Sequence, residues 1–150
     1  MSYELRAVTI PDDWRAMHDI RQKVLFAPGR HSISYDENHP DDRADGNTPF
    51  LLFENEEPLG VARLDERGET GIVRLVAIVQ HKQRKGYGLR LNNFIEAEAK
   101  RRGVRILRVN AAPDAVGFYL KAGWSEKLWD PTELVGLGQG AIQMEKVICE

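Results

Sequence analysis

The hydrophobic positions change their spacing along the chain, and these changes predict the order of the secondary-structure elements. The apolar run at residues 5–10 indicates a short strand. Pro11 then opens a segment with the helical repeat, in which the repeating positions are Trp14, Met17, Ile20, Arg21 and Val24. The polar segment 27–48 follows, with the chain breakers Pro28-Gly29, His39-Pro40 and Asp45-Gly46-Asn47. An irregular connection of this length is often functional.

Three strand-like runs come next in close succession, at residues 50–53, 59–64 and 72–79. The turns between them are short, which predicts an antiparallel meander. A basic loop with two glycines then leads into a helix whose apolar face holds Tyr87, Leu91, Phe94 and Ile95. This helix is predicted to end at residues 100–103, where three basic residues precede a glycine. Basic side chains are favourable at the negative end of the helix dipole, and glycine readily adopts the left-handed conformation that ends a helix.

The rest of the chain predicts a strand at 104–110, a short helix at 113–122 and two last strands at 124–129 and 141–148. The order β-α-β-β-β-α-β-α-β-β indicates an α/β fold of the α+β type. We expect one domain over residues 1–150, with a mixed, mostly antiparallel central sheet of about six to seven strands flanked by about four helices.

Composition narrows the class of protein. The chain has 150 residues, 42% of them hydrophobic and 29% charged, as is typical of a soluble globular domain. No apolar run approaches the roughly 20 residues that span a bilayer, and the N-terminal residues do not resemble a secretory signal. Cys149 is the single cysteine, so an intramolecular disulfide and an all-cysteine metal site are excluded. We therefore expect a cytoplasmic protein without a membrane partner.

The charge is unevenly distributed, although the net charge is only −2. Residues 81–105 carry eight basic and two acidic side chains, whereas residues 31–48 carry five acidic and one basic. Opposite local fields on one small domain are able to serve partners of opposite charge. The same clusters also arise as ordinary solvated surface.

The sequence Gln83-Arg84-Lys85-Gly86-Tyr87-Gly88 lies between a buried-looking strand and an amphipathic helix. Its glycines let the backbone approach a ligand closely, and the N–H groups at the start of the helix favour an anion, such as phosphate or pyrophosphate. A P-loop would need a Gly-Lys-Ser/Thr ending, and a Rossmann fingerprint would need a third glycine in place of Leu91, so both are excluded. A glycine pair alone also fits a tight strand-to-helix turn.

Three segments together resemble the GCN5-related N-acetyltransferase (GNAT) superfamily. One is the hydrophobic strand 75–79. Another is the loop, in which Gln83, Gly86 and Gly88 match the motif Arg/Gln-x-x-Gly-x-Gly/Ala. In the third, the matches to Ala-x-x-Phe/Leu-Tyr-x-x-x-Gly-Phe are Ala115, Phe118, Tyr119 and Gly123, with Trp124 in place of the usual phenylalanine.

The resemblance implies that acetyl-coenzyme A is the acetyl donor. In this family the pantetheine arm inserts where the strand before the loop diverges from the next parallel strand. Main-chain groups of Ile78 and Val79 would pair with that arm, and main-chain amides of the loop would hold the pyrophosphate. The implied cofactor-binding residues are Ile78, Val79, Gln83, Arg84, Lys85, Gly86, Tyr87, Gly88 and Leu89.

The resemblance further implies direct transfer, in a ternary complex, to an amine of a small molecule or peptide. A strand amide at Ile78 or Val79 would polarise the thioester carbonyl, and Tyr119 would donate a proton or a hydrogen bond to the departing thiolate. Tyr119 also fits a structural role as a core aromatic. Phe118 and Tyr119 are neighbours on a helix, however, so one can face the core and the other a cleft.

Two positions depart from the family pattern. Ala112 stands where members often have an asparagine that contacts the cofactor, so that contact is not expected. The strand 72–79 contains Arg74 and no carboxylate, although many members have a glutamate there that acts as general base through water. The base then has to come from Asp65, Glu66, the acidic segment, a histidine such as His39, or water.

In this family the segment after the first helix usually covers the acceptor cleft. Its acidic side chains Asp36, Glu37, Asp41 and Asp42 suit a cationic amine, and they equally suit a solvated loop in which Asp41 or Asp42 caps a turn. His31 and His39 flank these carboxylates, but no metal-site spacing is present, so no metal is expected.

Two other functions remain open at the level of sequence. Nucleic-acid binding by the basic stretch 81–105 is disfavoured, because Tyr87 is the only suitable group interleaved with the charge. A non-catalytic sensor of acetyl-coenzyme A fits the missing strand carboxylate. Homodimers are common in the family, and the sequence does not decide this point.

Overall fold

The computed structural model describes residues 2–27 and 33–150, which form a seven-stranded sheet with the strand order β1-β2-β3-β4-β5-β7-β6. The strands are β1 (Tyr3–Ala7), β2 (Asn47–Glu54), β3 (Glu57–Arg67), β4 (Thr70–Ile78), β5 (Ile106–Ala111), β6 (Ser125–Glu126) and β7 (Ile142–Val147). β4 and β5 pair in parallel, and the other neighbours in this sheet pair antiparallel. The predicted meander and the mixed, mostly antiparallel sheet are confirmed.

The described residues contain three α-helices: α1 (Pro11–Val24), α2 (Tyr87–Arg101) and α3 (Val116–Lys121). The remaining helical residues form short 3-10 turns, which are η1 (Pro40–Arg43), η2 (Gln80–Lys82), η3 (Pro113–Ala115), η4 (Pro131–Glu133) and η5 (Gly136–Gly138). None of the helices in the described ranges is long and apolar enough to cross a membrane.

The predicted strand at 124–129 is reduced to the two residues of β6. The reason lies in Gln143 of β7, whose side-chain oxygen accepts hydrogen bonds of 2.8 Å from the main-chain amides of both Trp129 and Asp130. These amides are satisfied by a side chain instead of a strand partner, so main-chain pairing with β7 does not continue beyond the Lys127 amide, which bonds to the Gln143 carbonyl at 2.9 Å.

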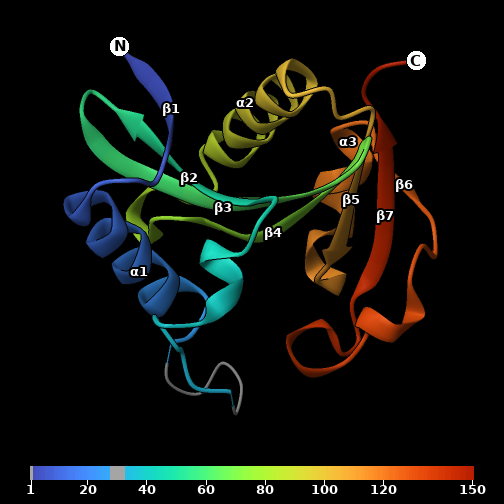
Figure 1. Cartoon of the computed structure of the whole chain (residues 1–150), viewed down its shortest axis with the longest axis horizontal. Coiled ribbons are helices and arrows are strands. Elements are labelled where there is room, and N and C mark those ends of the chain that lie inside the picture. Colours follow the sequence, from blue (N-terminus) through green and yellow to red (C-terminus); the bar gives the residue numbers. More distant parts are fainter. Residues whose placement is uncertain (1, 28–32) are drawn as a thin grey trace.

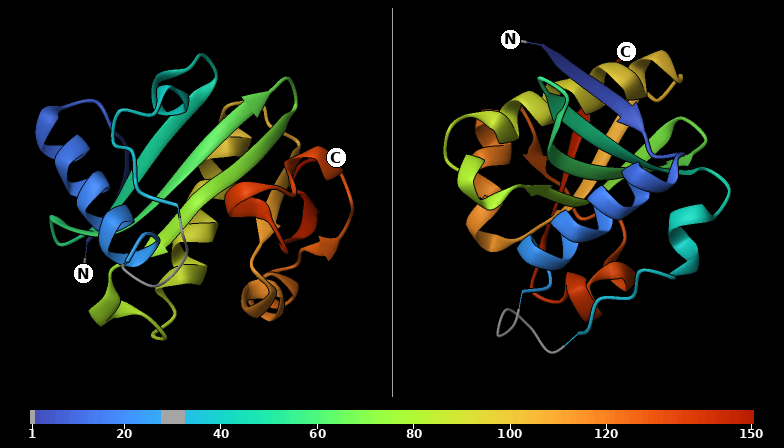
Figure 2. Two further views of the ribbon diagram at one scale, coloured as in Figure 1. Left: turned by 90° about the horizontal axis from the view of Figure 1, so that it is seen from below. Right: turned by 90° about the vertical axis from the view of Figure 1, so that its left-hand side faces the viewer.

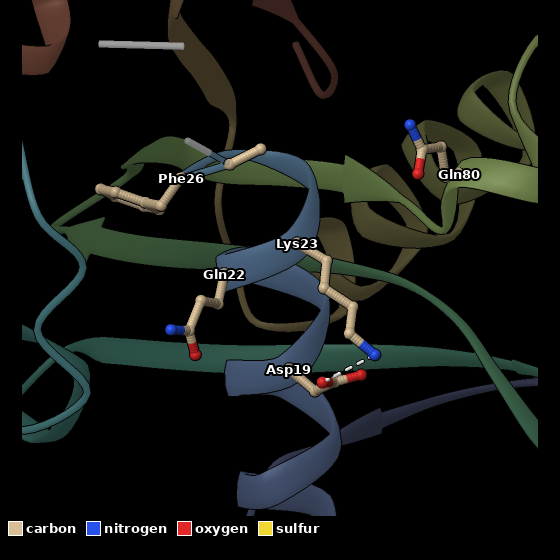
Figure 3. Close-up of a pocket in the computed structure, with 6 residues that line it drawn as sticks. Asp19, Gln22, Lys23, Phe26 and Gln80 are labelled. Carbon is tan, nitrogen blue, oxygen red and sulfur yellow. Dashed lines mark ion pairs between the residues drawn. The ribbon is translucent and has the colours of Figure 1, made fainter. Parts of the chain in front are cut away.

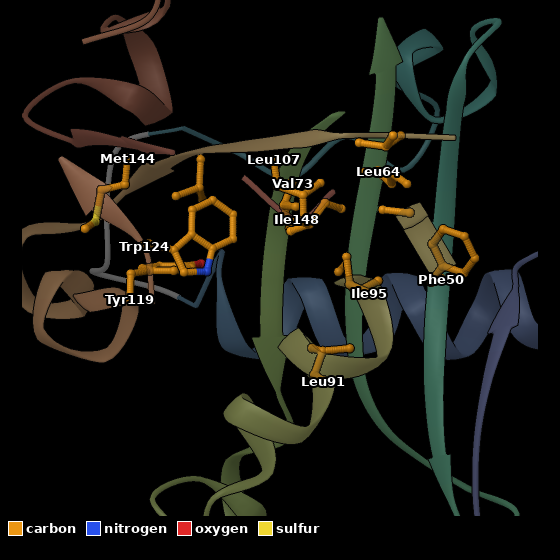
Figure 4. Packing of buried hydrophobic residues seen from close by; sticks show 14 of the residues in the cluster. Phe50, Leu64, Val73, Leu91, Ile95, Leu107, Tyr119, Trp124, Met144 and Ile148 are labelled. Carbon is orange, nitrogen blue, oxygen red and sulfur yellow. The ribbon is translucent and has the colours of Figure 1, made fainter. Parts of the chain in front are cut away.

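The sheet has α1 on one face and α2 and α3 on the other (Figures 1 and 2). The smaller core lies under α1, where the packed side chains include Met17, Ile20, Leu51, Val61 and Ala77. The larger core lies between the sheet and the other two helices (Figure 4), and it includes Leu91, Ile95, Tyr119 and Trp124.

β4 diverges from β5 part-way along its length (Figure 1). Their pairing ends at Val73 and Val109, although β4 continues beyond that point. β4 also contains a bulge there: Leu75 has a φ of 53°, and Leu75 and Val76 together oppose Ala62 of β3. A bulge bends its strand and increases the local twist, which accounts for the divergence. We call the region where β4 and β5 no longer pair the splay.

Candidate active site

The loop that joins β4 to α2 is tied to the end of β4. The side-chain amide of Gln83 donates a hydrogen bond of 3.0 Å to the carbonyl oxygen of Ile78. Arg84 and Gly86 both have positive φ angles, of 63° and 86°. This left-handed conformation is easy for glycine and unfavourable for other residues, so the conformation of Arg84 has to be stabilised by its surroundings. Gly86 immediately precedes α2 and directs the chain into the helix.

The beginning of α2 has the properties of an anion site. Its first turn contains no acidic residue, and no side chain caps it at Gly86. The first amides of a helix have no partner within the helix and carry the positive end of its dipole. Arg84 and Lys85 are exposed beside this turn. Lys82, by contrast, is paired with Glu54 at 3.0 Å, so it is not a free cation.

The main chain of Ile78, and not that of Val79, faces the splay. The Val79 amide donates a hydrogen bond of 2.9 Å to the Leu59 carbonyl of β3. Hydrogen-bonded and non-hydrogen-bonded pairs alternate in an antiparallel ladder, so the adjacent pair, Gly60 and Ile78, directs its main-chain groups away from each other. The Ile78 amide therefore points to the β5 side of β4, whereas the Val79 amide is already engaged.

The ring of Tyr119 lies in the core, and its hydroxyl has no hydrogen-bond partner in the described part of the chain. The residue is 8% exposed, and its ring meets those of Phe118 and Trp124 edge-on, at centroid distances of 5.1 and 5.2 Å. Burial raises the pKa of Tyr119 to about 12, so the hydroxyl stays protonated at neutral pH. It makes no hydrogen bond with the described residues, and it is not among the unpartnered atoms sealed from solvent, which belong to Arg21 and Trp124. No contact within the described residues therefore uses the proton of this hydroxyl.

A series of alternating charges crosses the α1 face of the sheet. Arg21 of α1 contacts Asp42 at 2.8 Å, and Asp42 also accepts a hydrogen bond of 3.1 Å from Arg63 of β3. Arg63 pairs with Asp65 at 2.7 Å, and Asp65 pairs with Arg74 of β4 at 2.8 Å. Burial acts to raise the pKa of Asp42, but the two arginines outweigh this effect and lower it. Asp42 is thus held ionised within the fold.

The series ends at Glu133 of η4, on the far side of the splay. Both carboxylate oxygens of Glu133 accept hydrogen bonds from Arg74, at 2.8 and 2.9 Å. Asn110 of β5 donates to the same carboxylate at 3.0 Å and accepts a hydrogen bond from Gln143 of β7. No sequence pattern indicates Glu133, because it lies 59 residues from Arg74. These side chains connect the two diverging strands across the splay.

Three of the groups considered as general base from the sequence, Asp65, Glu66 and His39, are engaged in other contacts. Asp65 is 2% exposed and bound by two arginines. Glu66 pairs with Arg102 at 3.1 Å. Nδ1 of His39 accepts a hydrogen bond from the Asp41 amide at 3.2 Å, so His39, and neither aspartate, caps η1.

The family model of the acetyltransferase (GNAT) domain matches residues 31–147, which is most of the chain and includes both the loop and Tyr119. This chain belongs to the GNAT family. The resemblance carried by residues 83–88 and 115–124 is thereby confirmed.

Proteins named as acetyltransferases resemble the chain over four-fifths of its length or more. A candidate acetyltransferase of Bacillus subtilis (strain 168) is 26% identical over 121 residues, which are 80% of this chain and 82% of that protein. The ribosomal-protein-S18-alanine N-acetyltransferase of Escherichia coli aligns over 99% of this chain and 96% of its own, at 19% identity and a TM-score of 0.76. The PaiA N-acetyltransferase of Thermoplasma acidophilum, solved with coenzyme A, aligns over 98% and 99%, at 16% identity and a TM-score of 0.76. The two structures share the fold of this chain.

In this GNAT protein an open hollow of about 510 Å³ lies beside the end of β4 (Figure 3). Its lining residues are Asp19, Gln22, Lys23, Phe26, Ala27 and Gln80. Asp19 and Lys23 form an ion pair of 3.1 Å within it. Because Gln80 follows β4 by two residues, the hollow opens next to the end of the strand that borders the splay.

The acidic segment of the GNAT protein is divided between the interior and the surface. Asp42 is buried in the charge series, whereas Asp36, Glu37 and Asp41 are not buried. His31 lies outside the described residues. Within residues 2–27 and 33–150, no three His, Cys, Asp or Glu side chains are grouped so that they could hold a metal ion.

Proposed function

We propose that this GNAT protein transfers the acetyl group of acetyl-coenzyme A to an amine of a small molecule or peptide, directly within a ternary complex. The observation that carries the proposal is the state of Tyr119. Its hydroxyl is protonated and has no hydrogen-bond partner among the described residues. Tyr119 lies on α3, which packs against the beginning of α2. Such a group is suited to donate a proton to a ligand held by the loop.

The splay and the loop fit a coenzyme A thioester. The Ile78 amide faces the splay, where it would offer a hydrogen-bond donor to the acyl end of the pantetheine arm. The first amides of α2, with Arg84 and Lys85, suit a pyrophosphate. A Cβ atom at Gly86 would meet nothing within 4 Å, so the loop has open space in front of it.

Acetyl-coenzyme A supplies an activated acetyl carbonyl, and two groups of the protein act on the transfer. The amine nitrogen bonds to the acetyl carbon while the carbon–sulfur bond breaks. The Ile78 amide donates a hydrogen bond to the carbonyl oxygen, and the Tyr119 hydroxyl gives its proton to the departing sulfur. Tyr119 then regains a proton from water. The Val79 amide takes no part, because its proton is donated to Leu59.

The proton that the amine loses goes to water in this proposal. The carboxylates in the charge series on the α1 face do not serve as the base, because each already accepts hydrogen bonds from at least one arginine. They are Asp42, Asp65 and Glu133. The acceptor approaches from this face, through the hollow at Gln80. The unburied Asp36, Glu37 and Asp41 favour a cationic amine over an anionic one.

Calorimetry with acetyl-coenzyme A, followed by thiol release with a panel of amines, tests the proposal. The panel contains polyamines, aminoglycosides, lysine-like amines and peptides with free N-termini. We expect acetyl-coenzyme A to bind and at least one amine to raise thiol release above hydrolysis. Binding without transfer to any amine would favour the sensor instead, and absence of binding would contradict both functions.

A further inference from the structure

Glu54, at the end of β2, contacts both ends of the loop that joins β4 to α2. Its Oε1 pairs with Nζ of Lys82 at 3.0 Å, and its Oε2 accepts a hydrogen bond of 2.8 Å from the Tyr87 hydroxyl. Lys82 immediately precedes the loop residues 83–86, and Tyr87 immediately follows them. We infer that Glu54 is a positioning residue for coenzyme A, because it holds the two ends of the phosphate loop on one carboxylate.

A third contact to the same carboxylate comes from outside the loop. The Tyr3 hydroxyl of β1 donates a hydrogen bond of 2.9 Å to Oε2, the oxygen that Tyr87 also uses. The guanidinium carbon of Arg90 lies over the Tyr3 ring, 4.0 Å from the ring centroid. Glu54 thus joins the loop to the edge of the sheet. Together, Lys82, Glu54 and Tyr87 form what we call the loop clamp.

The charge of Glu54 is what makes the clamp effective. Hydrogen bonds from Lys82, then Tyr87 and Tyr3, lower the pKa of this carboxyl from 4.5 to about 2. Glu54 is therefore ionised at any working pH, and hydrogen bonds to an ionised acceptor are the stronger ones. Without the contacts, a carboxylate near a phosphate site would only repel the ligand. Glu54 can therefore favour coenzyme A binding only through the loop conformation that it stabilises.

The loop needs such support because its backbone is unfavourable by itself. Arg84 adopts the left-handed region, and a residue other than glycine leaves that region readily when its surroundings release it. The hydrogen bond of Gln83 to Ile78 fixes the loop from the side of β4, and the clamp fixes it from the side of β2. Coenzyme A then meets a loop already in its binding conformation, so less ordering opposes binding.

The inference rests on the proposed function, and coenzyme A and pantetheine, which lacks the phosphates, are the probes. Tyr87→Phe removes one hydroxyl from the clamp, and Tyr3→Phe removes an equivalent hydroxyl from the same oxygen without touching the loop. We expect Tyr87→Phe to raise the Kd of coenzyme A by about tenfold, as when the competent loop conformation falls to roughly a tenth of the population. Tyr3→Phe should leave that Kd unchanged, and pantetheine should bind equally to all forms.

Glu54→Gln provides a second test through the sign of its effect. If Glu54 acts through the clamp, removing its charge weakens coenzyme A binding and raises the KM for acetyl-coenzyme A at unchanged kcat. If it acts only as a nearby negative charge, the same change tightens binding and overturns the inference. Equal coenzyme A affinities in wild type and Tyr87→Phe would overturn it as well. Wild-type protein that does not bind coenzyme A would instead overturn the proposed function, and the inference with it.

Discussion

The first turn of α2 packs against the ring of Phe118: a Cβ atom at Gly88 would lie 3.5 Å from its Cε1 atom. This contact joins the two segments that carry the GNAT resemblance, since Gly88 belongs to the loop motif and Phe118 precedes Tyr119. The beginning of α2 and the helix that carries Tyr119 are thereby neighbours in space, although α2 and β5 separate the two motifs in sequence.

The two glycines of the loop should differ in their tolerance of a side chain. Gly86→Ala places a Cβ on a residue with a φ of 86°, which costs about 1–2 kcal/mol or shifts the loop. Gly88→Ala adds a methyl group at ordinary contact distance from Phe118. We expect Gly86→Ala to lower the Tm and weaken coenzyme A binding, and Gly88→Ala to preserve both. Thermal melts and calorimetry on the two variants measure this, and equal behaviour would contradict the assignment of Gly86.

Tyr119→Phe should separate catalysis from stability. The hydroxyl has no hydrogen-bond partner among the described residues, so its removal should leave the Tm nearly unchanged. Loss of the proton donor should lower kcat by roughly 10²–10⁴-fold with little change in acetyl-coenzyme A affinity. Steady-state turnover with the amine found in the panel measures this, with Tyr3→Phe as the control. Unchanged kcat, with chemistry limiting the rate, would remove Tyr119 from the mechanism.

Arg84→Ala combined with Lys85→Ala should weaken coenzyme A and leave pantetheine unaffected. Both side chains are exposed beside the start of α2, where they add to the field of the helix dipole. The matched control is Lys100→Ala with Arg101→Ala, which removes the same charge from the other end of α2. Calorimetry at two salt concentrations should show that the Kd of coenzyme A depends less on salt in Arg84→Ala/Lys85→Ala than in the wild type, and as much as in the wild type in the control. Equal losses for coenzyme A and pantetheine would contradict phosphate contact.

Asp65→Asn should reduce stability without changing the pH dependence of kcat/KM. Asp65 is buried between Arg63 and Arg74, and breaking such a pair costs about 3–5 kcal/mol. If water accepts the proton, kcat/KM rises with pH towards the pKa of the acceptor amine in both forms. Urea unfolding and a pH–rate profile test this together. Loss of the acidic limb of the profile in Asp65→Asn would identify Asp65 as the base instead.

The contribution of Glu54 to stability should disappear in acid. Its pKa is lowered from 4.5 to about 2 in the folded protein, so its stabilising effect is complete above about pH 4.5 and is lost as the pH falls towards 2. The Tm difference between wild type and Glu54→Gln should therefore shrink over that interval. Hydrogen bonds from Arg101 and then Arg102 lower the pKa of Glu98 to about 2 as well. The Tm difference between wild type and Glu98→Gln should therefore shrink over the same interval. A constant Tm difference across the interval would contradict these pKa values.

The order of elements and the two motifs could be predicted from the sequence because both are local properties. A helical or alternating repeat is set by neighbouring residues, and Gln83 to Gly88 and Ala115 to Trp124 each carry their pattern within a few positions. The extent of the predicted strand 124–129 was wrong, because the Gln143 side chain that ends it belongs to β7.

Only the tertiary structure decided which groups meet around the candidate site. The alternation of the β3–β4 ladder turns the Ile78 amide away from β3 and bonds the Val79 amide to it, and a one-residue change of register would reverse this. Glu54 meets Lys82 and Tyr87, and Arg74 meets Glu133, only after the strands have paired. Side-chain contacts between residues so far apart depend on how the strands are placed in three dimensions. Local spacing carries no information about them.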